Sequence, residues 1–492
     1  MRRWDLALVA WIAALAVVFV RAGWRHGPGV PLDDPYIYLD YARSAAGGHW
    51  LQYNPGDPPT SAATSLLWLG LLTLGRWVGV RGAGMLWWAL GVALVCALAA
   101  AWLCRRAASA LGAADWQAAA LAGAVCATGA VAISLWGGLE VPLVLVAVCA
   151  GAEAWLAGAE RRALAVACLL PLARPDVALA VAVVAPLLRR PYGLLPGIAL
   201  GGYALAMWRW TGTPVMAGGS AKLLALTPGL ALGHTLAQAL VGAAAAVVDP
   251  WGWAGPGHGP LLPELLPGAV LLAWAALARR GRALALVAGA GLALEGAAFG
   301  PQAVFYQFGR YLVPYLPLLL LAAWDGAGRL RRPLPVAALG LALLGLPGAV
   351  TTFHRASGEI SGQQVAIGRW VRRVLPRRAV LVVNDAGAMA YYGHRYTIDA
   401  VGIATRGFAA AARTPGQPGE LAALARFLAA RGLQGRPLYA AIYPDWLPAI
   451  AAAGVPVRRF QLPGRTIIDE RTVVLYRLTD PPRTGGSPPA GA

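Results

Sequence analysis

Two adjacent carboxylates, Asp33 and Asp34, follow the first apolar run of the chain. Tyr36 and Tyr38 come directly after them, so polar and aromatic side chains gather near what would be a membrane surface. A carboxylate held there is able to act as general base on a hydroxyl group of an acceptor. It also suits a divalent cation, because hard cations prefer oxygen ligands. The competing interpretation is a solvated loop in which an aspartate caps a helix that starts at Pro35.

A second set of ionisable residues interrupts the apolar runs: Glu140, Arg174, Asp176, Glu295 and Arg310. A charged group at membrane depth costs roughly 3 kcal/mol or more unless it is paired or hydrated, so these residues are functional candidates. Arg174, Arg310 and Lys222 are placed to reach an external cavity, where cations suit a phosphate or pyrophosphate. For Arg174 and Asp176 the alternative is a structural ion pair that holds a helix break.

The composition shows what kind of scaffold positions these residues. Of 492 residues, 58% are hydrophobic and 13% are charged, and the mean hydropathy is +0.59. Ordinary soluble domains are about 25% charged, so lipid must cover part of this apolar surface. The net charge of +19 comes from arginines clustered between apolar runs, where they set topology. We therefore expect a polytopic α-helical membrane protein that contacts membrane lipids and binds no nucleic acid.

Charge placement orients the spans. The run 64–80 holds Arg76 and starts after a polar loop, so we expect a re-entrant or interfacial helix there. The arginine clusters then fall on one side of the remaining runs, which the positive-inside rule makes cytoplasmic. The run 227–248 is expected to be interfacial, with a membrane hairpin as the alternative. About eleven runs qualify as spans: 5–21, 84–103, 117–136, 138–157, 163–173, 177–188, 193–210, 262–278, 283–300, 311–324 and 333–350.

The tail changes character after residue 351. Short β-branched runs alternate with helical segments there, which predicts a small C-terminal α/β domain. With a cytoplasmic N-terminus and eleven spans, this domain is extracytoplasmic. The expected divisions are a membrane domain at 1–351 with its first external loop at 22–83, an α/β domain at 352–480 and a disordered end at 481–492.

Several short motifs follow one another along the chain. Those of the membrane part are Asp33-Asp34-x-Tyr36, Asn54-Pro55-Gly56, Thr64-Ser65-x-x-Trp68, Gly138-Leu139-Glu140, Arg174-Pro175-Asp176, Ala221-Lys222 and Arg310-Tyr311-Leu312-x-Pro314. The tail adds Asp385-Ala386-Gly387, Tyr391-Tyr392 and Ile398-Asp399. In this order the motifs resemble the GT-C superfamily of membrane glycosyltransferases, which use polyprenyl-phosphate sugars. The similarity is to bacterial members related to protein mannosyltransferases and arabinofuranosyltransferases, and it spans the whole chain.

The resemblance implies an inverting transfer of a sugar from a polyprenyl-phosphate donor to an extracytoplasmic glycan, lipid or protein acceptor. One carboxylate of the first external loop would be the general base; this is Asp33 or Asp34, with a slight preference for Asp33. No cofactor is certain, a divalent metal is possible, and its ligands are unknown. The segment Thr213–Ala217 lacks the asparagine usual in the family before the lysine. The residues expected to bind the donor phosphate or substrate are Tyr36, Tyr38, Glu140, Arg174, Asp176, Lys222, Arg310 and Tyr311.

Two other functions compete with this one. A transporter or flippase of a lipid-linked or anionic substrate would use the intramembrane charges as a path, but it predicts inverted repeats, which the sequence lacks. A binding protein of the cell envelope would recognise its partner through the tail. In the glycosyltransferase interpretation the tail lies above the Asp33–Asp34 loop and helps to form the acceptor site.

Overall fold

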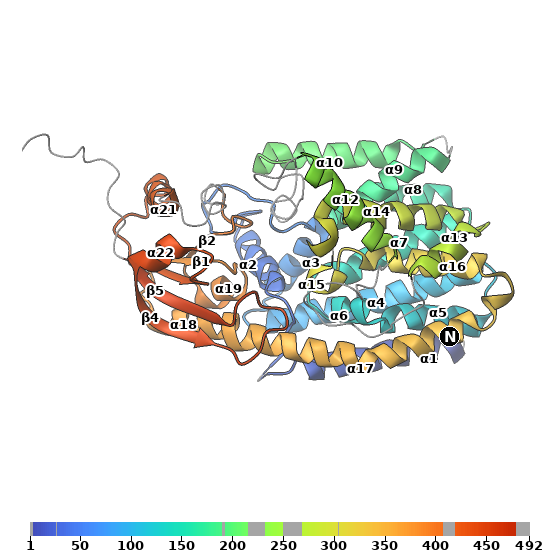
Figure 1. Ribbon diagram of the computed structural model, residues 1–492, viewed down its shortest axis with the longest axis horizontal. Helices are drawn as coiled ribbons and strands as arrows, with labels where there is room; N and C mark the ends of the chain where they lie inside the picture. Colours follow the sequence, from blue (N-terminus) through green and yellow to red (C-terminus); the bar gives the residue numbers. More distant parts are fainter. Residues whose placement is uncertain are drawn as a thin grey trace, which may run out of the picture.

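The computed structural model describes residues 3–25, 27–188, 192–214, 232–248, 268–303, 305–406 and 419–478. A bundle of helices makes up most of the molecule, and a small sheet with its own helices sits at one end (Figure 1). The predicted combination of an α-helical membrane part and a C-terminal α/β unit is therefore observed. Lys222 lies outside the described residues.

The apolar runs form the helices of the bundle, and proline or glycine commonly marks their ends. Their bounds are α1 Arg3–Ala22, α2 Asp34–Ala46, α3 Leu66–Trp77, α4 Gly84–Ala110, α5 Asp115–Ala127, α6 Gly129–Leu135, α7 Val141–Leu156, α8 Glu160–Ala173, α9 Pro175–Val184, η1 Ala185–Leu188, α10 Leu195–Thr211, α12 Leu232–Val248, α13 Gly268–Ala276, α14 Arg282–Ala303, α15 Tyr306–Gly309, η3 Val313–Tyr315, α16 Leu316–Gly326, η4 Gly328–Arg331 and α17 Leu334–Ile360.

Among the described residues, four helices are long and apolar enough to cross a membrane alone: Arg3–Ala22, Gly84–Ala110, Arg282–Gly300 and Leu334–Val374. The pair α5 and α6, bent by 72°, would make a fifth if it is one span. Helices of 10–17 residues are shorter than the ~20 residues that a bilayer needs. The fold is that of a multi-pass membrane protein, and the number of eleven spans stays a prediction.

Two predictions about the bundle concern the break at Arg174 and the run 227–248. The break at Arg174 is present, because this residue is extended (φ −165°, ψ 108°) between α8 and α9. The described part of the run 227–248 forms α12, which packs against α14. Its Gly242 lies so close to Gly296 of α14 that a Cβ at Gly242 would be 2.1 Å from the Gly296 carbonyl oxygen. Whether this run is interfacial or a membrane hairpin stays a prediction.

The sheet of the tail has the strand order β2-β1-β3-β5-β4. Strand β1 is parallel to both of its neighbours, whereas β5 is antiparallel to β3 and β4. Helix α17 continues through η5 into α18 without a break, so one helix crosses the expected domain boundary at residue 351. The bounds are η5 Ser361–Val365, α18 Ala366–Val374, β1 Val380–Val383, α19 Ala388–Gly393, β2 Tyr396–Asp399, α21 Gly419–Ala430, β3 Leu438–Ile442, α22 Pro448–Ala453, β4 Gly454–Gln461 and β5 Thr472–Leu478.

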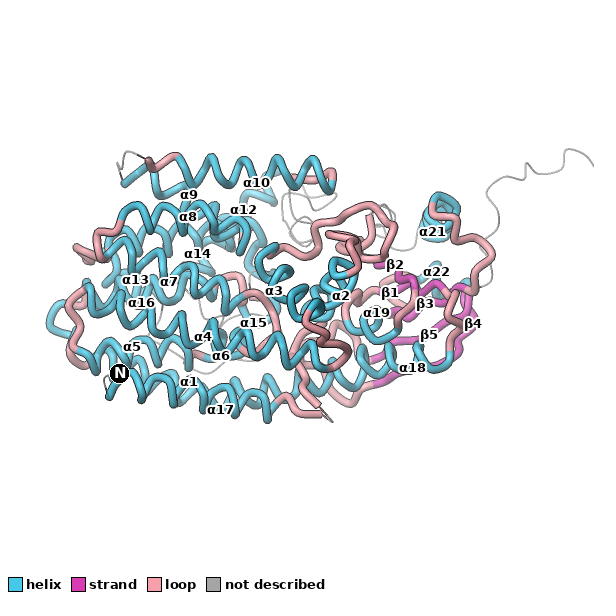
Figure 2. The backbone as a smooth tube through the Cα atoms, turned by 180° about the vertical axis from the view of Figure 1, so that it is seen from behind, coloured by secondary structure: helices cyan, strands magenta, loops and turns pink. Residues whose placement is uncertain are grey.

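Strand β1 is buried on both faces, as expected for a parallel central strand. Val380 and Val382 pack into a cluster with residues of α21 and α22, and Leu381 and Val383 belong to the large cluster that includes α18 and α19. The second cluster continues into the membrane helices. The tail and the bundle therefore share one apolar core, and Figure 2 shows α18 and α19 on the face of the sheet nearer the bundle.

The start of α1 lies at the end of the bundle away from the sheet (Figure 1). Ion pairs join several arginines in this region: Arg105 to Asp5 and Asp115, and Arg106 and Arg162 to Glu153. Arg105 thus lies beside the start of α1, and the tail lies at the other end of the molecule (Figure 1). That all the arginine clusters share one side stays a prediction.

Candidate active site

Helix α2 places the two aspartates in different directions. Asp33 is the residue before the helix, Asp34 is its first residue, and Pro35 follows with a φ suited to a first turn. Successive residues around a helix are about 100° apart, so neighbouring carboxylates need not share a partner. Asp34 lines a cavity in the bundle, and Asp33 instead contacts the tail.

The cavity encloses about 460 Å³. The start of α2, the segment before α7, the break between α8 and α9, and the residues after α15 supply most of its polar side chains, and α10 and α14 add Tyr203 and Glu295. Helices α9, α10 and α14 supply an apolar wall with Leu179, Leu200, Leu294 and Phe299. The polar lining consists of Asp34, Tyr38, Thr64, Glu140, Arg174, Asp176, Tyr203, Glu295, Arg310 and Tyr311.

Two arginines are held by carboxylates inside this cavity. Arg310 Nη2 lies 2.6 Å from Asp34 Oδ2. Arg174 is buried, donates to both carboxylate oxygens of Asp176 at 2.6–3.1 Å, and donates through Nη1 to the Arg310 carbonyl oxygen at 3.3 Å. Both guanidinium carbons lie 5.2 Å from the ring centroid of Tyr311. The two cations are thus fixed side by side, and the expected structural Arg174–Asp176 pair is present within a cavity.

Two further carboxylates complete the polar end. Glu140 is 5% exposed, and its Oε2 is buried with no hydrogen-bond partner among the described residues. Glu295 is 3% exposed and accepts a hydrogen bond of 3.2 Å from the Tyr315 hydroxyl. A buried carboxylate oxygen without a donor is costly. The Glu140 oxygen therefore marks a position where a donor from a substrate, such as a sugar hydroxyl, would be stabilising.

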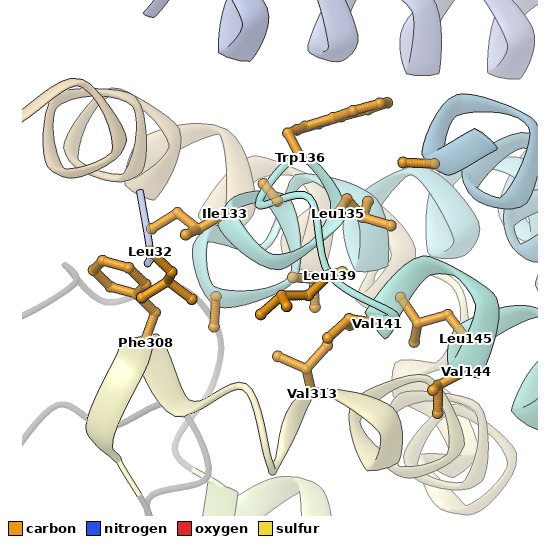
Figure 3. Packing of buried hydrophobic residues seen from close by; sticks show 14 of the residues in the cluster. Leu32, Ile133, Leu135, Trp136, Leu139, Val141, Val144, Leu145, Phe308 and Val313 are labelled. Carbon is orange, nitrogen blue, oxygen red and sulfur yellow. The ribbon is translucent and has the colours of Figure 1, made fainter. Parts of the chain in front are cut away.

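Backbone geometry brings the separate segments together. Gly138 has φ +80°, and a Cβ there would lie 3.3 Å from Pro35, so only glycine lets this loop meet α2 closely. Gln307 and Phe308 also adopt left-handed φ values of 56° and 66°, which reverse the chain just before Arg310. Figure 3 shows Phe308 packed beside Leu32, the residue before Asp33. Apolar packing therefore sets Asp34 opposite Arg310.

Asp33 fastens the first loop to the tail. Its Oδ2 accepts from the Gly387 amide at 2.7 Å and its Oδ1 from the Ala388 amide at 2.8 Å, at the start of α19. Burial and the neighbouring Asp385 raise the pKa of Asp33 well above its ordinary value, and the two backbone bonds lower it only in part. A Cβ at Gly387 would lie 2.1 Å from the Asp33 carbonyl oxygen, so the two segments meet where only glycine fits.

Tyr36 belongs to the same junction and not to the cavity. Its ring lies 5.6 Å from Tyr392 and 6.1 Å from Tyr391. Farther along the loop, Asn54 exchanges two hydrogen bonds of 3.0 Å with the Thr397 backbone, and the Tyr396 hydroxyl donates to Asp57. The tail motifs that match the family are thus largely the surface on which the first loop docks.

A loop after β2 extends this junction to the cavity. Burial raises the pKa of Asp399 to about 6, although bonds from the Ala404 and Val401 amides lower it. These bonds, of 2.7 and 2.9 Å, hold the loop so that Ile403 lines the cavity. The tail is therefore part of the site.

The structure brings most predicted site residues together. Asp34, Tyr38, Glu140, Arg174, Asp176, Arg310 and Tyr311 all line the cavity. Asp33 and Tyr36 face the tail, and Lys222 is outside the described residues. Glu295 was recognised as an intramembrane charge but not placed in the site, and Ile403 carries no sequence signal. Within the described ranges, no group of three or more histidine, cysteine, aspartate or glutamate side chains is arranged to hold a metal ion.

Fold and site define a multi-pass membrane protein with the GT-C fold, built around a cavity that combines paired arginines, carboxylates and an apolar wall. The crystal structure of ArnT from Cupriavidus metallidurans bound to undecaprenyl phosphate is similar, with a TM-score of 0.54 and 14% identity over 95% of this chain and 97% of that one. The apo state of the same protein gives a TM-score of 0.52 and 15% identity, with the same shares covered.

Two other comparisons are less informative. Archaeal oligosaccharyltransferase AglB from Archaeoglobus fulgidus, in complex with an inhibitory peptide and a dolichol-phosphate, gives a TM-score of 0.49 and 14% identity over 96% of this chain and 75% of that one. A family model described as a domain of unknown function, DUF8728, matches residues 358–477, which lie mostly in the tail. No curated protein matches the sequence.

Proposed function

We propose that this chain is an inverting glycosyltransferase that moves a sugar from a polyprenyl-phosphate carrier to an acceptor outside the cytoplasm. The observation that carries the proposal is the cavity itself. Its polar end offers two guanidinium groups and four carboxylates, and its wall from α9, α10 and α14 is apolar. A lipid phosphate needs both surfaces. ArnT, which shares the fold, was solved with undecaprenyl phosphate, and this supports the choice of donor.

In this proposal Asp34 is the general base. It lies in the cavity beside Arg310, whereas both oxygens of Asp33 already accept backbone N–H groups of the tail. A donor phosphate would compete with Asp34 for Arg310, because phosphate binds a guanidinium group strongly. Binding of the donor would thus release the Asp34 carboxylate to take a proton from the acceptor hydroxyl. From the sequence, Asp33 was slightly preferred as the general base; these contacts favour Asp34 instead.

The other polar groups have roles that follow from their positions. Arg310 and Arg174 would stabilise the charge on the departing lipid phosphate. Glu140 and Glu295 would accept hydrogen bonds from sugar hydroxyls. Because the tail contributes Ile403 to the cavity and lies at the end of the bundle opposite the start of α1 (Figure 1), we infer that transfer takes place on the extracytoplasmic side, with the N-terminus cytoplasmic.

The experiment uses purified protein in lipid nanodiscs, a panel of labelled polyprenyl-phosphate sugars, and envelope extract as the source of acceptors. We expect release of polyprenyl phosphate and transfer of label, with inversion at the anomeric carbon detected by NMR. Arg310→Gln should abolish transfer, while Asp445→Asn, on an exposed tail residue, should leave it unchanged. Binding or flipping of the labelled lipids without any transfer would favour the transporter alternative instead.

A further inference from the structure

A second polar group of residues lies in the tail behind Asp33. Asp385 Oδ2 accepts from the Gln364 amide at 2.9 Å and from the Tyr443 hydroxyl at 2.8 Å. Both bonds fall on the same oxygen, and Asp385 is half-buried. None of these residues lines the cavity described above. They form what we name the tail subsite: Gln364, Asn384, Asp385, Tyr443 and Trp446.

Two polar atoms of this subsite lack a partner among the described residues. They are Gln364 Oε1, an acceptor, and Asn384 Nδ2, a donor, on side chains that are 1% and 5% exposed. Leaving such a group unsatisfied costs about 1–3 kcal/mol. Gln364 bonds to Asp385 through the nitrogen of the same amide group, so its free oxygen lies next to that carboxylate.

An aromatic surface adjoins these polar groups. Trp446 is 37% exposed, and its ring centroid lies 5.3 Å from that of Tyr443, whose hydroxyl donates to Asp385. Tryptophan presents a large apolar face at little entropic cost. Carboxylate, amide and exposed indole together match the hydroxyl groups and the apolar ring face of a sugar.

The carboxylates near Asp385 indicate which glycans the tail subsite would bind. Burial is the main cause that raises the pKa of Asp385 to about 6, and the neighbouring carboxylates of Asp469 and Asp34 raise it further. Asp385 in turn raises the pKa of Asp33. A row of carboxylates repels phosphate and uronate groups. The tail segment that carries Asp385 also contacts Asp33 through the Gly387 and Ala388 amides, so the subsite adjoins the loop that carries Asp34, toward which an acceptor hydroxyl must point.

We propose that the tail subsite binds the end of a neutral glycan acceptor, with Asp385 as a specificity-determining residue and Trp446 as its stacking surface. This proposal rests on the glycosyltransferase function for its biological role, but binding of glycans to the subsite is testable without a donor. It predicts that a neutral sugar binds and that the same sugar with a phosphate or carboxylate does not.

The full-length protein in detergent is applied to an array of neutral, phosphorylated and uronic-acid oligosaccharides. We expect binding to neutral glycans only, weakened about tenfold or more by Asp385→Asn and by Trp446→Ala, because a hydrogen bond to a charged group or a stacked ring is lost. Trp446 is a surface residue, so its variant tests the proposal even if Asp385→Asn disturbs the tail. The matched control is Asp445→Asn, which removes an exposed neighbouring carboxylate and should bind as wild type.

The proposal is wrong if charged glycans bind better than neutral ones, or if neutral glycans do not bind. It is also wrong if both subsite variants bind neutral glycans as the wild type does. Asp34→Asn separates this result from the proposed reaction, since it should keep glycan binding and lose transfer. If neutral glycans bind as expected but no polyprenyl-phosphate sugar supports transfer, the proposed function fails while the tail subsite stands.

Discussion

Substituting the two adjacent aspartates one at a time is the most direct test of the site. Asp34→Asn removes a carboxylate that lies in the cavity 2.6 Å from Arg310. General bases contribute about 10²–10⁴ in rate, so we expect kcat to fall by that factor. The change keeps shape and size, so the KM for the donor should change much less than kcat.

Asp33→Asn acts on a different contact. The new side chain keeps one acceptor oxygen and loses the other, so one of the two amides at Gly387 and Ala388 loses its partner. A hydrogen bond to a charged group contributes about 1.5–3 kcal/mol. That loss weakens docking of the tail, which other contacts such as Asn54 to Thr397 still hold. We expect kcat to stay within about tenfold of wild type.

Steady-state kinetics of both variants, with one polyprenyl-phosphate sugar at saturation, decides between these expectations. Limited proteolysis would show separately whether the tail of Asp33→Asn is loosened. If Asp33→Asn loses as much kcat as Asp34→Asn while its tail stays docked, the assignment of the base to Asp34 is wrong.

Three other changes test the junction and the cavity. Gly387→Ala should undock the tail and raise its protease sensitivity, because the new Cβ would lie 2.1 Å from the Asp33 carbonyl oxygen. Gly393→Ala should not, because its nearest atom, on the Val371 side chain, would be 3.3 Å away and the nearest backbone atom 3.8 Å away. The pKa of Asp399, raised by burial to about 6, means that the folded tail keeps a proton that the unfolded chain loses near pH 4. The free energy of unfolding of the tail should therefore fall by roughly 3 kcal/mol as pH rises from 4 to 6 and then level off. Hydrogen exchange of the tail amides measures this free energy, and in Asp399→Ala it should show no such fall. Glu140→Gln should raise the KM for the donor more than it lowers kcat, and an unchanged KM would remove Glu140 from substrate binding.

Much of the cavity could be predicted because its residues are rare in their surroundings. Arginine and glutamate within apolar runs stand out whatever the fold, and a proline between Arg174 and Asp176 indicates a break. Strands β1, β3 and β5 are β-branched or apolar runs of the kind from which the α/β tail was predicted. Strand β4 was not predicted, because it is an exposed edge strand with a proline and two arginines, a composition typical of loops.

Other features depend on contacts that no local pattern encodes. The different directions of Asp33 and Asp34 follow from amides more than 350 residues away. The placement of α12 depends on close glycine packing against α14. The span count depends on helices too short to identify alone.

The junction at Asp33 also changes how the role of the tail should be tested. Removal of all residues after Thr352 would cut a helix that runs unbroken from Leu334 to Val374, and it would take away both the partners of Asp33 and the Ile403 side chain in the cavity. An effect of the truncation on acceptor binding could then not be separated from an effect on donor binding. Changes at Trp446 avoid this problem because its exposed side chain lies outside both the junction and the cavity. If the tail recognises the acceptor, Trp446→Ala should raise the KM for the acceptor and leave the KM for the donor unchanged, and an equal rise in both would mean that the tail acts only by holding the first loop in place.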